Sequence, residues 1–109
     1  MVVAATGFFD GVHLGHRQII DTLVRIAHER DGRSVLITFW PHPRMVLQKD
    51  ARELRLLTSL YEKKELISSM GVDKVEVLPF TRDFSRMSTE AYLRDVVKGR
   101  FGADAILLG

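Results

Sequence analysis

The feature that most constrains the fold is an alternation between two spacings of apolar residues along the chain. Four short runs are nearly continuous in apolar and β-branched residues, as expected for strands buried on both faces of a sheet. These runs are Val2–Thr6, Ser34–Trp40, Lys74–Leu78 and Ala105–Leu108. Between them, apolar residues recur three and four positions apart, which is typical of helices with one buried face. The alternation predicts an α/β fold in which a parallel sheet is covered by helices on both faces.

Capping and turn residues predict where three helices begin and end. The helices are expected over residues 15–30, 59–70 and 89–101. Asp31 and Gly32 are expected to stop the first helix. Ser59 and Glu62 have the spacing of a capping box, which predicts that the second helix begins near Ser59, and the segment before it follows neither pattern. Ser88 is a suitable N-cap for the third helix.

Composition and charge exclude several classes of protein. With 109 residues, of which 46% are hydrophobic and 28% charged, the chain suits one folded, soluble domain rather than a disordered segment. No apolar run is long enough to cross a bilayer, and the N-terminus carries no signal-peptide pattern. The absence of cysteine excludes disulfides and favours the cytoplasm. The net charge of +2 is spread along the chain, so we expect neither nucleic acid nor a membrane as a partner.

The turn between the first strand and the first helix carries the most informative residues. Gly7 and Gly11 permit sharp backbone turns and the close approach of a ligand. The helix that follows offers unpaired N–H groups to a phosphate at its N-terminus. His13 and His16 lie three positions apart, so both imidazoles project from the same face of that helix. Two imidazole donors at a helix N-terminus suit a triphosphate and the charge that develops during phosphoryl attack.

Two plainer interpretations of this turn stay open on the residues alone. Glycine-bounded turns between strand and helix occur in most α/β domains without binding phosphate. The two histidines could instead hold a metal ion, but Asp10 is the only nearby candidate for a third ligand. We therefore expect no metal site built from protein side chains.

Residues 7–16, GFFDGVHLGH, resemble the GxFDGxHxGH signature of the adenylyltransferase domain of prokaryotic FAD synthetase, the bifunctional riboflavin kinase/FMN adenylyltransferase. HxGH marks a whole superfamily of nucleotidyltransferases, whereas FDG directly before it is far more specific. Further stretches resemble the same family, namely TFWPHPR at 38–44, LLTSLYEKKELISSMGVDKV at 56–75, VLPF at 77–80 and the segment 84–93. The resemblance covers essentially the whole chain. Phe8 and Trp40 depart from the family pattern, which commonly has Thr and Glu there.

The resemblance implies an enzyme that transfers AMP from ATP to FMN, giving FAD and pyrophosphate, with Mg²⁺ as the metal cofactor. His13 and His16 would be the catalytic residues. The expected ATP-binding residues are Gly7, Phe8, Phe9, Asp10, Gly11 and Gly15. The expected contacts with flavin or phosphate are His42, Arg44, Pro79 and Phe80. The family's second nucleotide motif and its riboflavin kinase domain would follow Gly109, so we expect residues 1–109 to be a partial domain that is inactive alone.

Other interpretations stay open. A different HxGH transferase would act on a phosphopantetheine, nicotinamide nucleotide or cytidylyl acceptor, although FDG and PHPR disfavour it. A module that binds nucleotides without catalysis, or a domain kept for assembly, is the alternative from another class. Phe39, Trp40 and Phe80 fit either a wall that stacks on the flavin or an ordinary core. His28 and the run Glu62–Glu65 are expected to be exposed on their helices.

Overall fold

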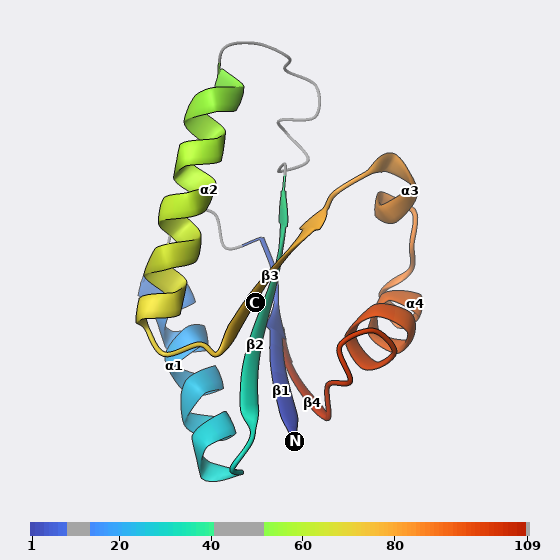
Figure 1. Ribbon diagram of the computed structural model, residues 1–109. Helices are drawn as coiled ribbons and strands as arrows, with labels where there is room; N and C mark the ends of the chain where they lie inside the picture. Colours follow the sequence, from blue (N-terminus) through green and yellow to red (C-terminus); the bar gives the residue numbers. More distant parts are fainter. Residues whose placement is uncertain (9–13, 41–51, 109) are drawn as a thin grey trace.

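The computed structural model describes residues 1–8, 14–40 and 52–108, of which residues 14, 15 and 52–60 are described by their backbone only. Within these residues, strands and helices follow one another in the expected alternation (Figure 1). In chain order they are β1 Val2–Thr6, α1 Leu14–Glu29, β2 Arg33–Trp40, α2 Arg52–Ser69, β3 Lys74–Pro79, α3 Arg82–Ser85, α4 Thr89–Ala91, the π-helix η1 Tyr92–Lys98, and β4 Ala105–Leu108.

The strands form one parallel sheet in the order β3-β2-β1-β4. β1 is a central strand, because Ala4 aligns with Val35 of β2 on one side and with Ile106 of β4 on the other. The chain steps outward from β1 through β2 to β3 and then returns to the opposite side of β1 to form β4. Such a reversal is the topological switch point, where open α/β sheets bind their ligands. The predicted Rossmann-like parallel sheet is confirmed.

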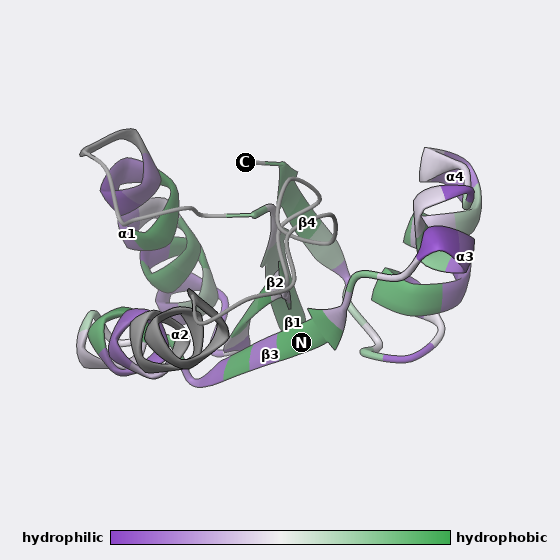
Figure 2. Cartoon of the chain, turned by 90° about the horizontal axis from the view of Figure 1, so that it is seen from above, coloured by the Kyte–Doolittle hydropathy of each residue, from purple (hydrophilic) through white to green (hydrophobic). Residues whose placement is uncertain are grey.

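Helices cover both faces of this sheet, as predicted. α1 and α2 lie on one face, whereas α3, α4 and η1 lie on the other, which the view from above shows clearly (Figure 2). Each face has its own core, because successive side chains of a buried strand point to opposite sides. The core under α1 and α2 contains Leu36, Ile20 and Ile67, and the core on the opposite face contains Ile37 and Val97.

The predicted stop of the first helix is confirmed. α1 ends at Glu29, and Asp31 follows in the left-handed region with a φ of 51°. The N–H of Gly32 donates to the carbonyl oxygen of Ala27 at 2.8 Å. A Cβ atom at Gly32 would lie 2.6 Å from the carbonyl oxygen of Met1, so the close approach of these two segments requires glycine.

α2 begins earlier than predicted, at Arg52 rather than near Ser59. The six residues from Arg52 to Leu57 are all Arg, Glu or Leu, which are strong helix formers, so the helix extends well before the serine. Ser59 lies inside the helix, and its spacing from Glu62 is therefore not a capping box. The long α2 runs alongside α1 on the same face of the sheet (Figures 1 and 2).

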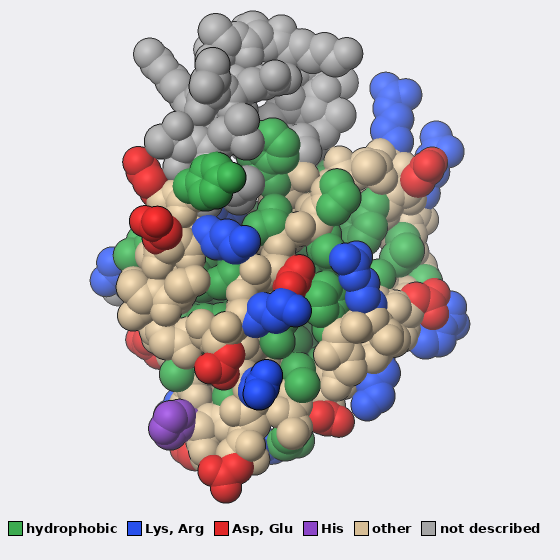
Figure 3. Space-filling view, in the orientation of Figure 1, with side chains coloured by type: hydrophobic (Ala, Val, Ile, Leu, Met, Phe, Trp, Pro, Cys, Tyr) green, Lys and Arg blue, Asp and Glu red, His purple; other side chains and the backbone are tan. Residues whose placement is uncertain are grey.

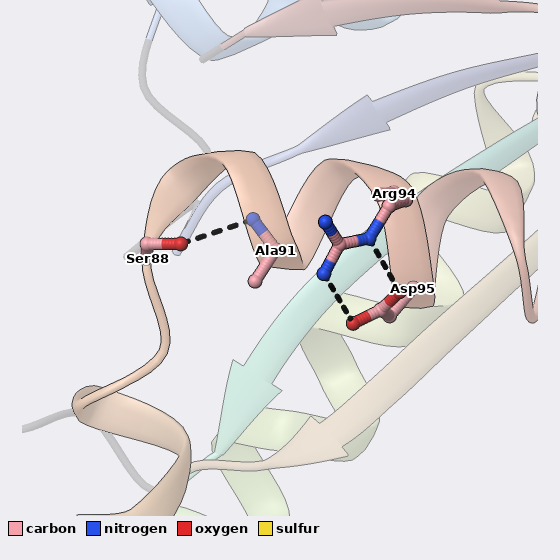
Figure 4. A network of polar contacts seen from close by, with 4 residues as sticks. All are labelled: Ser88, Ala91, Arg94 and Asp95. Atoms are coloured by element: carbon pink, nitrogen blue, oxygen red, sulfur yellow. Dashed lines mark hydrogen bonds and ion pairs between the residues drawn. The ribbon is translucent and has the colours of Figure 1, made fainter.

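The third predicted helix is present but divided. Ser88 caps it as expected, because its Oγ atom accepts the N–H of Ala91 at 3.1 Å (Figure 4). At Tyr92 α4 gives way to η1, and the N–H of Gly99 then donates to the carbonyl oxygen of Arg94, five residues back, at 3.0 Å. The short helix α3 was not predicted, because four residues are too few to reveal a helical spacing.

Charged side chains of both signs are distributed over the surface. Basic and acidic groups are interspersed on the face shown in Figure 3, with hydrophobic side chains between them. Within the described residues, no helix is long and apolar enough to cross a membrane. The charge pattern of this face is thus mixed rather than gathered into one extended region.

Candidate functional site

The backbone at the carboxyl end of β1 is held by β2. The N–H of Gly7 donates to the carbonyl oxygen of Ile37 at 3.1 Å, which continues the pairing of the two strands by one residue. The hydroxyl group of the buried Thr38 donates to the carbonyl oxygen of Phe8 at 2.9 Å. The chain therefore leaves the sheet at a fixed point, and this point lies beside the topological switch.

His16 lies in the first turn of α1, at the same edge of the sheet. Its side chain is half-buried, and its Nδ1 atom is shielded from solvent. The first turn of α1 contains no acidic side chain that would compete for its N–H groups. This position, at the positive end of a helix dipole, suits an anionic ligand such as a phosphate.

Several predicted site residues lie outside the described part of the chain. These are Phe9, Asp10, Gly11, His13, His42 and Arg44, and Gly15 is described by its backbone only. Their roles stay predictions. Of the others, Gly7 and Phe8 follow β1, and Phe80 follows β3 at the same edge of the sheet. Pro79 ends β3 with an exposed side chain.

Five aromatic rings meet at this edge, on the face of the sheet that α3 and η1 cover. Phe8, Phe39 and Phe80 come from the ends of three strands, and Phe84 and Tyr92 come from the helices. Ring centroids are 5.2 Å apart for Phe8 and Phe39, 5.4 Å for Phe8 and Phe80, and 5.7 Å for Phe84 and Tyr92. The rings border a hollow of about 440 Å³, which is also lined by Thr6, Gly7, Ser85, Met87, Thr89, Leu93 and Leu108.

The two interpretations of the aromatic residues, a flavin wall and an ordinary core, both stay predictions. Phe39 and Phe80 both line the hollow; Phe39 is buried in the core, and Phe80 is half-buried and packs against the same core. Trp40 is not among the residues that line the hollow. Phe84 and Tyr92 were not predicted as site residues, because their contact depends on how α3 and η1 fold back onto β2. No local spacing reveals a contact of that kind.

A pair of hydroxyl groups lines the same hollow. The Oγ1 atom of Thr6 and the phenolic oxygen of Tyr92 are 2.5 Å apart. Burial raises the pKa of Tyr92, and the hydrogen bond to Thr6 opposes that rise. Tyr92 and Val97 are five residues apart, and the wider turn of the π-helix brings both against the same core.

Lys63 of α2 reaches this edge of the sheet from the opposite face. Its Nζ atom donates to the carbonyl oxygen of Phe8 at 2.5 Å and lies 3.4 Å from the Oγ1 atom of Thr38. The exposure predicted for the run Glu62–Glu65 is confirmed except at Lys63, which is half-buried. Sequence alone does not distinguish Lys63 from Lys64, because only the packing of α2 on the sheet makes one of them face inward.

Comparison of this sequence with known proteins identifies the family of the chain. A model of the family described as FAD synthetase matches residues 1–109. The bifunctional riboflavin kinase/FMN adenylyltransferase of Listeria monocytogenes is 41% identical over 91 residues, which are 84% of this chain and 29% of that protein. The Bacillus subtilis protein of the same name is 36% identical over 97 residues, which are 89% of this chain and 31% of that protein. The chain thus spans about a third of the length of these curated relatives.

Solved structures with a similar fold agree with the observed sheet. A crystal structure titled as a macrolide-efflux protein from Streptococcus pneumoniae has a TM-score of 0.81 at 24% identity, covering 99% of this chain and 36% of that chain. A universal stress protein from Archaeoglobus fulgidus has a TM-score of 0.58 at 15% identity, covering 100% of this chain and 75% of that chain. At these identities the likeness supports the α/β fold alone.

Ionisation of Tyr92 is expected to destabilise the protein in alkaline solution. Because burial raises its pKa, the folded protein holds the phenolic proton more tightly than the unfolded chain does. This contribution to stability is complete below the unfolded pKa of about 10 and is lost as the pH rises through the raised pKa. The free energy of unfolding, measured in urea from pH 8 to 11, should therefore fall more steeply in the wild type than in Tyr92→Phe.

At pH 8 the same substitution should lower the free energy of unfolding by about 1 kcal/mol, because the Thr6 hydroxyl loses its partner. Tyr61→Phe, at an exposed position on α2, is the matched control and should leave both quantities unchanged. Equal alkaline slopes in the wild type and in Tyr92→Phe would contradict the burial of this phenol.

Proposed function

The chain belongs to the FAD synthetase family, and we propose that it carries the ATP-phosphate-binding part of a site that transfers AMP from ATP to FMN. An oxygen of the FMN phosphate would attack the α-phosphorus of ATP. The bond from this phosphorus to the oxygen that bridges to the β-phosphate would break, so that FAD forms and pyrophosphate leaves. One observation carries the proposal. At the carboxyl end of β1, the N-terminus of α1 lies on one face of the sheet and the aromatic hollow lies on the other.

The ATP phosphates are assigned to the α1 side of this end of β1. His16 and the backbone N–H groups of the first helical turn provide donors there, and Gly7 lets the chain turn close to a ligand. The family motif adds His13 and the residues Phe9, Asp10, Gly11 and Gly15 by resemblance. Together these groups would hold the triphosphate and stabilise the charge that builds up in the transition state.

The flavin is assigned to the aromatic hollow. A volume of about 440 Å³ lies in the range of small-molecule sites, and its lining is mostly apolar, with five aromatic rings and a few hydroxyl groups. Phe80 is half-buried and lines the hollow, where its ring could contact a planar ring system. The hydroxyl groups of Thr6, Ser85, Thr89 and Tyr92 in the lining could orient such a ring. His42 and Arg44 are proposed contacts to phosphate or flavin by resemblance.

The proposed reaction needs positioning and charge stabilisation more than proton transfer. The terminal phosphate of FMN is already ionised near neutral pH, so it needs no general base. Mg²⁺ would neutralise charge between the phosphates. Mg²⁺ in such sites is usually held by phosphate oxygens and water with one or two carboxylates.

We place this chain in a longer cytoplasmic polypeptide. The named relatives are bifunctional and about three times as long as the matched region, which supports a riboflavin kinase domain beyond the part described here. ATP and FMN would be its substrates. The purified 109-residue chain should make no detectable FAD, whereas the complete protein should make FAD from ATP, Mg²⁺ and FMN.

The role of His16 is tested in that complete protein. If its imidazole stabilises the transferred phosphoryl group, His16→Ala should lower the rate of FAD formation by about two orders of magnitude. Phosphorylation of riboflavin should continue at the wild-type rate. His28→Ala, at an exposed position on the same helix, is the matched control. Equal rates of FAD formation in the two variants would reject the assignment of His16.

The flavin side is tested by Phe80→Ala. Loss of the ring should raise the KM for FMN about tenfold, the effect of roughly 1.4 kcal/mol, while the KM for ATP changes little. Phe101→Ala is the control, because Phe101 also packs on this core but follows η1, at the opposite edge of the sheet. Steady-state kinetics that show the same KM for FMN in both variants would place the flavin elsewhere.

A further inference from the structure

Lys63 connects helix α2 to the residue that follows strand β1. The side chain begins on α2, and its ammonium group donates to the carbonyl oxygen of Phe8 at 2.5 Å. Its neighbour Lys64 is exposed on the same helix. Ordering a lysine side chain costs conformational entropy, so a half-buried lysine that reaches a backbone carbonyl implies a compensating interaction.

The carbonyl oxygen of Phe8 accepts hydrogen bonds from two other elements of the fold. It accepts the hydroxyl group of Thr38 at 2.9 Å as well as the Lys63 ammonium, so both of its lone pairs are engaged. The Nζ atom of Lys63 also lies 3.4 Å from the Oγ1 atom of Thr38, and Thr38 as a residue is 1% exposed. These contacts tie together the end of β1, the buried strand β2 and the helix α2.

Holding this carbonyl has a geometric consequence for the site. A peptide unit is planar, so holding the Phe8 oxygen from two sides restricts the orientation of this carbonyl group at the end of β1. Gly7, one residue earlier, is already held by Ile37 of β2. The two anchors together hold Gly7 and Phe8, the two residues that follow β1, against β2 and α2.

We propose that Lys63 is a positioning residue for adenylyl transfer: through the Phe8 carbonyl it holds Gly7 and Phe8, two of the residues expected to bind ATP, at the end of β1. This role rests on the proposed function. A shift of about 1 Å in groups that align reactants can cost about a hundredfold in rate. A charged donor suits the task, because charge-assisted hydrogen bonds are shorter and stronger than neutral ones.

Three variants of the complete protein test this role. Lys63→Met keeps a stem of similar length but removes all three donors, Lys63→Arg keeps the charge, and Lys64→Met is the matched control. We expect kcat/KM for ATP in FAD formation to fall about a hundredfold in Lys63→Met, to fall less in Lys63→Arg and to be unchanged in Lys64→Met. Riboflavin phosphorylation should be unchanged in all three variants.

The free energy of unfolding, measured in urea on the same samples, separates positioning from simple support of the fold. A Lys63→Met protein that is less stable, yet has the control's kcat/KM where both are folded, would overturn the role. If Lys63→Met does not fold, Thr38→Val replaces it, because it removes the second donor to the same carbonyl and should lower kcat/KM in the same direction. A wild-type protein that makes no FAD would overturn the proposed function, whereas a wild type that makes FAD beside an unaffected Lys63→Met would overturn this inference alone.

Discussion

The whole site depends on the parallel pairing of β1 with a strand on each side. Parallel strands need crossover helices, so all their carboxyl ends meet at one edge while the helices cover the faces. β1 is central and is paired with β2 and β4, so its carboxyl end lies at the topological switch point, where the order of the strands reverses. The hydrogen bond from Gly7 to Ile37 extends this rigidity one residue into the turn. The described groups assigned to the site lie around this end of β1.

The two faces of the sheet give this edge two kinds of chemistry. On the face of α1 and α2, the described groups are a helix N-terminus and the imidazole of His16, both of which suit phosphates. On the other face, aromatic rings and the hydroxyl pair of Thr6 and Tyr92 suit a planar, mostly apolar ligand. In the proposed transfer, the attacking oxygen of FMN and the leaving oxygen of pyrophosphate lie on opposite sides of the α-phosphorus, and this division of the site would accommodate both.

Sequence predicts those parts of the structure that have a local physical signature. The strands were found because they are nearly continuous in apolar residues, and Ser88 was found because an N-cap acts on a neighbouring N–H group. The start of α2 was predicted near Ser59 but lies at Arg52, because the residues before Ser59 are strong helix formers and extend the helix. The phosphate turn was suggested by its glycines and histidines, and its family resemblance pointed to FAD synthetase. Lys63 and Tyr92 were missed as site residues because their partners lie far away in the chain, at Phe8 and Thr6.

The most direct test of this account is amide hydrogen exchange of the complete protein with each ligand alone. A non-reactive analogue of ATP with Mg²⁺ should slow exchange in peptides that cover residues 7–20, where β1 leads into α1. FMN should slow exchange in peptides that cover residues 80–93, which line the aromatic hollow with α3 and the start of η1. Protection of both regions in this pattern is the result that the two-faced site predicts. Protection by FMN that is confined to peptides from α1, or no protection of residues 7–20 by the ATP analogue, would contradict it.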